Sequence, residues 1–194
     1  MARYTGPKWK ISRRENFSVF GDDQWKKRPT LPGQHGTSRG RTSNYGIQFR
    51  EKQKVKRMYG MLEKQFSNLY KTASKATGDT GIKMLQLLET RLDNVVYKLN
   101  LAKTMNQARQ FVSHGHIFVN SKRVNLPSYH ITVGDEISYE PSFEKSDIIK
   151  IIKEETKSRT VPKWIENSKV VMVPTRDMID SSIQESLIVE YYSR

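Results

Sequence analysis

The stretch from Arg91 to His130 constrains the fold most, because it carries in succession the signals of two short helices and a tight hairpin. Apolar residues recur in its first part at spacings of three and four, which predicts an amphipathic helix. These residues are Leu92, Val95, Val96 and Leu99. A second helix is predicted to begin at Thr104, because Gln107 three residues later completes a capping-box pattern. Gly115 stands where such a helix would end in a left-handed turn.

A hairpin is predicted directly after the second helix. Residues 117–119 alternate in polarity, Asn120 and Ser121 form the expected turn, and residues 122–124 return. A further hairpin is predicted to join residues 131–133 to residues 137–139 through a turn at Gly134 and Asp135. The two helices would therefore rest on a small antiparallel sheet.

Cations gather on this stretch, which holds six lysine and arginine residues but a single acidic residue, Asp93. The cations are Arg91, Lys98, Lys103, Arg109, Lys122 and Arg123. A helix start with free N–H groups suits a phosphate, and Lys103 precedes the predicted start. Arg109 is predicted to project from the exposed helix face, together with Asn106, Gln110 and Ser113. We therefore favour a phosphate-binding surface over the alternative, a solvated face of a small domain.

The overall charge also favours a polyanionic partner. The 194 residues carry a formal net charge of +14, for which nucleic acid and an anionic membrane surface are the candidates. Residues 1–60 hold 15 lysine and arginine residues against four acidic ones, whereas residues 131–194 hold nine against 12. There is no cysteine, which excludes disulfides and thiolate zinc sites. No apolar run is long enough to span a bilayer, so a soluble, cytoplasmic protein is expected.

The sequence divides into three parts, and the fold class it predicts is α+β. Residues 1–44 are predicted to form an extended basic arm, because glycine and proline break up any long helix. A floppy tail is the alternative, but the arm also contains aromatic residues that could stack on unpaired bases. Residues 45–90 would form a helical domain completed by residues 178–194. Residues 91–177 would form an α+β domain with an RNA-binding core at residues 91–155.

Several elements outside the central stretch are predicted from apolar spacing. Residues 45–76 read as a helix that Gly60 divides. Its cations Lys52, Lys54, Lys56 and Arg57 are expected mostly off the buried face. A helix with Leu85 and Leu88 would run into the helix at Leu92. The remaining predictions are a helix at residues 146–157 with Ile148, Ile151 and Ile152 inward, a strand at residues 170–173, a helix cap at residues 180–182, and a buried LIVEYY segment folding back on the N-terminal helices.

The segment LAKTMNQARQFVSHGHIFVNSKRVNLPSY resembles the helix–helix–hairpin RNA-binding module of the fourth protein of the bacterial small ribosomal subunit. The flanks resemble the same family from end to end, in the family's order. They are MARYTGPKWKISRRE, PGQHG, SNYGIQFREKQKVKRMYGMLEKQF, LLETRLDNVVYKL and the ending SLIVEYYSR. Cysteines that bind zinc near the N-terminus of many members are absent, so the chain resembles the zinc-free branch. In that branch Phe17, Phe20 and Trp25 could replace the metal by packing.

The resemblance implies a helical first domain with an inserted module-bearing α+β domain. It implies early binding to the 5′ domain of small-subunit rRNA, nucleation of subunit assembly, and a part in translational accuracy. The implied partners are this rRNA, mRNA at its entrance path, and neighbouring subunit proteins, notably the fifth and also the third. No cofactor, metal, membrane or small-molecule substrate is implied. Arg39 and Arg41, after the PGQHG loop, correspond to residues that line the mRNA path.

The residue pattern and the resemblance together give the expected rRNA contacts. They are Arg3, Lys8, Lys10, Arg13, Arg14, Arg50, Lys52, Lys54, Lys56, Arg57, Lys103, Thr104, Gln107, Arg109, Gln110, His114, His116, Asn120, Lys122, Arg123, Ser128 and Tyr129.

Two other function classes compete with this interpretation. An RNA-modifying enzyme would use the module as its grip, with Asp93 as a lone catalytic aspartate. Such an enzyme needs a large catalytic domain. A local ion pair or a helix cap is the simpler expectation for Asp93, which lies near Arg91 and four residues after Glu89. A stress-linked factor that recycles stalled subunits would lack the long helical front. The four histidines show no metal-ligand spacing, and no catalytic motif is present, so we expect no enzymatic activity.

Overall fold

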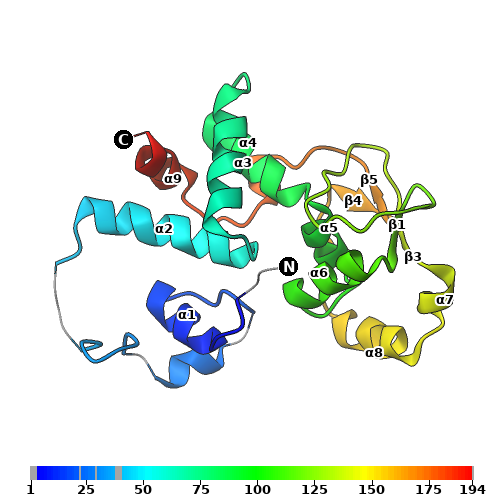
Figure 1. Ribbon diagram of the computed structural model, residues 1–194, viewed down its shortest axis with the longest axis horizontal. Helices are drawn as coiled ribbons and strands as arrows, with labels where there is room; N and C mark the ends of the chain where they lie inside the picture. Colours follow the sequence, from blue (N-terminus) through cyan, green and yellow to red (C-terminus); the bar gives the residue numbers. More distant parts are fainter. Residues whose placement is uncertain (1–3, 22, 29, 38–40, 194) are drawn as a thin grey trace. The chain divides into compact units, whose positions relative to one another are not determined.

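The computed structural model describes residues 4–21, 23–28, 30–37 and 41–193. The chain forms two compact units (Figure 1): Met1–Gly81 together with Ser181–Arg194, and Ile82–Asp180. The second unit is thus inserted in the sequence of the first. The units divide the chain at residues 81/82 and 180/181, whereas the sequence pattern placed boundaries at residues 90/91 and 177/178.

Helices build the described part of the first unit. They are α1 (Lys8–Glu15), the short 3-10 helix η1 (Gln24–Lys27), α2 (Asn44–Met58), α3 (Glu63–Lys75), the start of α4 (Thr80–Glu89) and α9 (Glu185–Tyr192). The arm is therefore not extended throughout, because residues 8–15 form α1 with Ile11 in the core. Gly60, at φ +58°, separates α2 from α3, as predicted.

The C-terminal segment folds back on α2, as predicted for LIVEYY (Figure 1), but Ile188 is the only fully buried residue among its six, and Glu190 is exposed. Ile188 is fully buried, and the ring of Tyr192 stacks on Tyr70 with 4.6 Å between centroids. Gln48 Nε2 on α2 donates a hydrogen bond of 2.7 Å to Glu190. The predicted cap at residues 180–182 is wrong, because α9 begins at Glu185 after Gln184, which makes no side-chain cap.

The second unit combines helices with two small antiparallel sheets, so the fold class is α+β, as predicted. After α4 come α5 (Leu92–Lys98), α6 (Met105–His114), β1 (Ile117–Val119), β2 (Lys122–Arg123), β3 (Ile137–Tyr139), α7 (Pro141–Glu144), α8 (Asp147–Thr156), β4 (Ile165–Glu166), β5 (Lys169–Val170) and η2 (Arg176–Met178). One sheet has the order β2-β1-β3, and the other pairs β4 with β5. Trp164 and Ile117 lie in one apolar core with residues of α5, α6 and α8.

Four expectations for this unit are wrong in detail. Helices α4 and α5 are separate, because Arg91 between them is extended. Residues 131–133 form no strand; the partner of β3 is β1, while Ile131 N–H donates to Thr90 and Gly134 N–H to Val170. Helix α8 buries Ile149 and Ile152 and leaves Ile148 and Ile151 exposed. Beyond residue 170 the predicted strand ends, and residues 171–173 are exposed.

Among the described residues, no helix is both long and apolar enough to cross a membrane.

Candidate nucleic-acid interface

Local sequence signals shape the α6–hairpin edge as predicted. Thr104 Oγ1 accepts a hydrogen bond of 3.2 Å from Gln107 N–H, and Gln107 Oε1 accepts one of 2.8 Å from Lys103 N–H. Gly115 ends α6 at φ +77°, where a Cβ atom would lie 2.1 Å from the Arg123 guanidinium. Asn120 and Ser121 make the β1–β2 turn with φ values of +50° and +62°.

The tip and edge of this hairpin carry the module's exposed cations. Lys122 and Arg123 are exposed on β2, and His114 and Gln110 are exposed on α6. Arg123 donates 2.9 Å to the backbone carbonyl of His114, a neutral acceptor that leaves the positive charge in place. The Lys122 ammonium has no ion pair with any residue that the structure describes. Ser128 and Tyr129 are also exposed.

The prediction that Arg109 projects from the exposed face is wrong. Its side chain is 14% exposed and its guanidinium lies 3.7 Å from the carboxylate of Asp93. Arg91 donates two hydrogen bonds to the same carboxylate, of 3.0 and 2.8 Å, which confirms the expected ion pair. Burial lowers the pKa of Arg109, and Asp93 counteracts that effect. Burial, reinforced by Arg91, lowers the pKa of His130. This cluster holds the interior together rather than presenting charge to solvent.

Helix α6 begins beside an acid of the chain itself. Lys103 Nζ lies 2.7 Å from Glu155 on α8, and Arg159 donates 2.9 Å to the Lys103 carbonyl. The lysine that precedes this helix start is therefore already paired with a carboxylate. His116 and Asn120 also have internal partners. His116 stacks on Phe143 at 4.0 Å and lies 3.4 Å from Glu140.

Asn120 ties the β1–β2 turn to the following loop. Its Nδ2 donates 2.7 Å to Asp135, and its Oδ1 accepts 3.0 Å from the N–H of Glu136. Thr132 donates to the same aspartate through its N–H and its hydroxyl. Although burial raises the pKa of Asp135, these hydrogen bonds from Thr132 and Asn120 lower it overall. The Asn120 amide therefore serves the fold in this structure.

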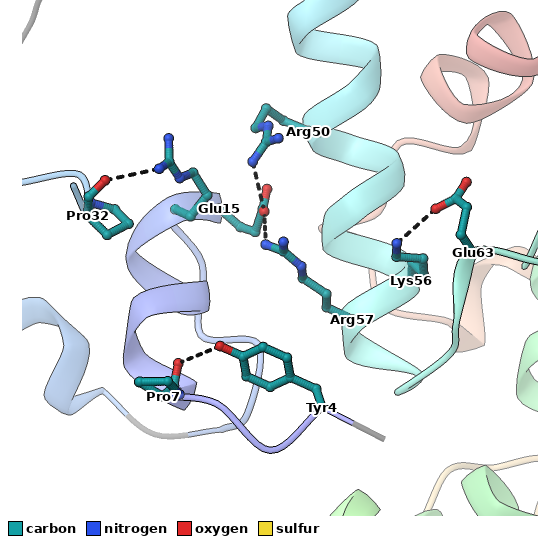
Figure 2. Close-up of polar contacts among 9 residues, drawn as sticks. Tyr4, Pro7, Glu15, Pro32, Arg50, Lys56, Arg57 and Glu63 are labelled. Atoms are coloured by element: carbon teal, nitrogen blue, oxygen red, sulfur yellow. Dashed lines mark hydrogen bonds and ion pairs between the residues drawn. The ribbon is translucent and has the colours of Figure 1, made fainter. Parts of the chain in front are cut away.

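The cations of α2 are paired within the first unit. Arg50 and Arg57 both contact Glu15 of α1, and Lys56 contacts Glu63 (Figure 2). Burial raises the pKa of Glu15, against the lowering effect of Arg50 and Arg57. Lys54 lies 2.8 Å from Glu51 and donates 2.7 Å to the carbonyl of Ser182.

Lys52 departs furthest from its predicted position off the buried face. Its side chain is 3% exposed, and its Nζ lies 2.7 Å from Glu63. The same atom lies 5.0 Å from the ring centroid of Phe49, 4.5 Å from Tyr191 and 5.8 Å from Tyr192. An ammonium group held over aromatic faces gains cation–π attraction that grows as water is excluded. Lys52 thus stabilises the contact between α2 and α9.

In the N-terminal part, two of the predicted RNA contacts also make hydrogen bonds within the chain. Arg13 Nε donates 2.9 Å to the carbonyl of Thr30, and Arg14 donates 3.0 Å to that of Pro32. Lys8 and Lys10 are exposed, as is Arg41. Arg3 and Arg39 lie outside the described residues. No group of three histidine or acidic side chains in the described ranges could hold a metal ion.

The hypothesis that aromatic packing replaces the metal gains partial support. Lys54 Nζ lies 5.3 Å from the ring of Phe17, and Lys8 Nζ lies 5.9 Å from that of Phe20. These contacts and the hydrogen bonds of Arg13 and Arg14 are among those that hold the described part of residues 17–32.

Sequence reasoning missed one set of basic residues, Lys64, Lys71 and Lys75 on α3. All three are exposed. Their helical spacing was a signal that could have found them, but the near-neutral net charge of residues 61–90 concealed it.

Comparison with known proteins places the whole chain in one family. Residues 3–89 match the family described as "Ribosomal protein S4/S9 N-terminal domain", and residues 90–137 match the "S4 domain". The chain is 47% identical to the small ribosomal subunit protein uS4 of Halothermothrix orenii and 48% identical to that of Hahella chejuensis. It is 47% identical to uS4 of Cutibacterium acnes, and all three matches cover 100% of both chains. The uS4 family consists of structural proteins and not of enzymes. These full-length matches, together with the exposed basic hairpin, show that the chain belongs to the uS4 family of small ribosomal subunit proteins.

Proposed function

We propose that this chain is a structural constituent of the small subunit of a bacterial cytoplasmic ribosome, and that it binds the 5′ domain of small-subunit rRNA early and helps nucleate assembly. The observation that carries this proposal is the exposed β2 edge, where Lys122 and Arg123 lie beside the end of α6 within the matched S4 domain. Lysine and arginine side chains on such an edge neutralise phosphates.

Recognition is expected to be of RNA shape and backbone. A-form RNA has a deep, narrow major groove that hides most base edges from side chains. The described module offers cations and exposed polar groups such as Gln110, His114 and Ser128, which suit phosphate and ribose contacts. We leave Arg109 out of the proposed surface, because its side chain is 14% exposed and its guanidinium lies 3.7 Å from the carboxylate of Asp93.

Lys122→Ala tests this surface. The substitution removes one exposed charge that forms no ion pair with the described residues, so it should weaken binding to small-subunit rRNA and reduce the slope of log K against log salt by about 0.7–0.9. Lys157→Ala, which removes an exposed lysine at the end of α8, is the matched control. Equal slopes for Lys122→Ala and the wild-type chain would remove the β2 edge from the interface.

The early role in assembly is tested by reconstituting the subunit from rRNA and its proteins with and without this chain. Omission should prevent the later proteins of the same rRNA domain from binding stably, since they need the RNA conformation that this chain holds. Normal binding of those proteins in its absence would leave rRNA binding intact and refute the nucleating role.

A second part of the proposal concerns the path by which mRNA enters the subunit. Arg41 is exposed, and with Arg39 it follows the PGQHG loop. These arginines would contact mRNA beside neighbouring subunit proteins, notably the fifth and also the third. Contact of the chain with the fifth protein would influence translational accuracy. Replacing both by alanine should spare assembly yet slow translation through structured messages. Loss of assembly instead would identify the loop as an rRNA contact.

A further inference from the structure

One face of α3 carries a row of lysines that the rRNA surface proposed above does not include. Residues 64, 68, 71 and 75 follow one another at spacings of four, three and four, and they are Lys64, Asn68, Lys71 and Lys75. At 3.6 residues per turn, these positions fall within an arc of about 60°. All four residues are exposed, whereas Phe66, Leu69 and Ala73 on the opposite face are buried. We call these four residues the α3 stripe.

The lysines of the α3 stripe have no acidic partner among the residues that the structure describes. The acids nearest to them in the sequence are occupied. Glu63 is bonded to Lys52 and Lys56, Asp79 accepts 2.7 Å from the N–H of Gly81, and Glu89 is buried and accepts 2.7 Å from Asn94. Residues 61–90 therefore have little net charge in the sequence, but the lysines of α3 form a positive stripe at the surface that these acids do not neutralise.

The cations of α2 show the contrast. Arg50, Lys52, Lys54, Lys56 and Arg57 all pair with acids of the chain itself. Cations that neutralise RNA phosphates release the counterions bound to them, and this release favours binding. Cations already paired with acids of the same chain contribute less to this effect. Helix α3 keeps its lysine ammonium groups in water, where they can exchange with the counterions of a polyanion.

We infer that the α3 stripe is a second rRNA-binding surface, which contacts the phosphate backbone of small-subunit rRNA. Lys64 to Lys75 spans about 16 Å along the helix at 1.5 Å per residue, enough for several phosphates. The exposed neighbours of the stripe on α3 are polar, such as Gln65, Thr72 and Ser74. A protein partner would require aromatic or aliphatic anchors at the centre of its interface, and this face offers none. The inference rests on the proposed function, because it assumes that the chain binds rRNA.

The test compares four forms of the full chain on small-subunit rRNA over a range of salt concentrations. They are the wild type, the triple variant Lys64→Ala/Lys71→Ala/Lys75→Ala, the same triple to arginine, and the control Lys145→Ala/Lys157→Ala/Lys163→Ala. The control removes three exposed lysines from the acidic C-terminal part of the chain. Circular dichroism checks folding, which should persist because alanine favours helix at exposed positions.

The α3 alanine triple should reduce the slope of log K against log salt by about 2–3, since each lost phosphate contact contributes about 0.7–0.9. The arginine triple should restore the slope, because it keeps the three charges, and the control should stay close to the wild type. An α3 alanine triple with the slope of the control would overturn the inference, and an acidic protein partner on this face would give that same result. If the wild-type chain itself failed to bind the rRNA, the proposed function would fail instead.

Discussion

At the scale of single residues, acids decide which cations remain available to a partner. Asp93, with a 1% exposed side chain, receives two hydrogen bonds from Arg91 and lies 3.7 Å from Arg109. Two of the six cations of the central stretch are thereby withdrawn from solvent. A buried carboxylate between guanidinium groups is tolerated because each charge compensates the desolvation of the others.

Asp93→Asn should destabilise the second unit by about 3 kcal/mol, because it leaves the buried charge of Arg91 uncompensated. Urea unfolding followed by amide hydrogen exchange in α5 and α6 measures the change. The matched control is Asp147→Asn, which also removes an acid from the first turn of a helix, but whose side chain is 88% exposed. Its effect should stay below about 1 kcal/mol. Equal effects of the two variants would show that burial of Asp93 is not what matters.

Glu63 should make the stability of the first unit depend on pH. Burial raises the pKa of Glu63, but hydrogen bonds from Lys52 and Lys56 lower it by a larger amount. The resulting pKa is about 2, compared with an ordinary value of 4.5. Because the folded-state pKa is the lower one, the stabilisation is complete above pH 4.5 and is lost as pH falls from 4.5 towards 2. The difference in unfolding free energy between the wild type and Glu63→Gln should therefore shrink over this window.

Acid titration of both proteins, monitored by urea unfolding, measures this difference. Since the Glu63 side chain is 48% exposed, 1 M salt should reduce the effect. A difference that is constant down to pH 2 would contradict the role of the two lysines.

At the scale of elements, turns fix the module more firmly than strands do. Strand β1 has three residues and β2 has two, too few to hold a register by pairing alone. The β1–β2 connection has positive φ at both central residues, the geometry that matches the twist of a two-residue hairpin. Asn120 adopts the left-handed conformation readily and is hydrogen-bonded to Asp135 and Glu136. Serine adopts this conformation less readily than asparagine, so Ser121 is the more strained of the two turn residues.

Ser121→Gly should therefore stabilise the second unit by about 1 kcal/mol, because glycine adopts φ +62° without the steric cost that serine incurs. Thermal or urea unfolding gives the sign directly. The control is Ser138→Gly, at an exposed position of β3. Here glycine only increases the conformational entropy of the unfolded chain, so it should destabilise the unit by about 0.5–1 kcal/mol. Loss of stability in Ser121→Gly would mean that the serine makes a contribution beyond its backbone.

At the scale of the whole molecule, the two ends of the sequence build the same unit. Helix α9 brings Ile188 and the rings of Tyr191 and Tyr192 to α2 and α3, some 120 to 140 residues earlier in the chain. Tyr192 donates 3.0 Å to Glu63 and lies over Tyr70, and burial together with Glu63 raises its pKa above the usual tyrosine value. The first unit is thus incomplete until the last residues of the chain are present.

Deletion of residues 185–194 should accordingly expose α2 and α3 to amide exchange while residues of the β1–β3 sheet, which belong to the second unit, keep their protection. Deletion of residues 193–194 alone is the control and should leave both units protected, because Ile188 and both tyrosines remain. Simultaneous loss of protection in the two units would show that they unfold as one cooperative body.

Local chemistry explains what could be predicted from the sequence. The cap at Thr104, the glycine at the end of α6, the hairpin turn and the division at Gly60 each depend on residues within a few positions of one another. Such signals act in an isolated segment as they do in the fold. The helices of residues 45–90 and the basic module were therefore predicted, whereas α1 within the arm was not. The return of the C-terminal segment was predicted from its apolar composition, and the family resemblance was confirmed.

The sequence by itself determined the elements, their turns and the excess of positive charge. Tertiary structure alone decided which charges reach solvent, because the neutralising acids come from remote positions: Glu15 lies 35 residues before Arg50, and Glu155 lies 52 residues after Lys103. For the same reason Arg109 and Lys52 became interior residues, while the lysines of the α3 stripe stayed exposed. An ion pair depends on distance in space, and a local pattern of residues gives that distance only for close neighbours in the sequence such as Arg91 and Asp93.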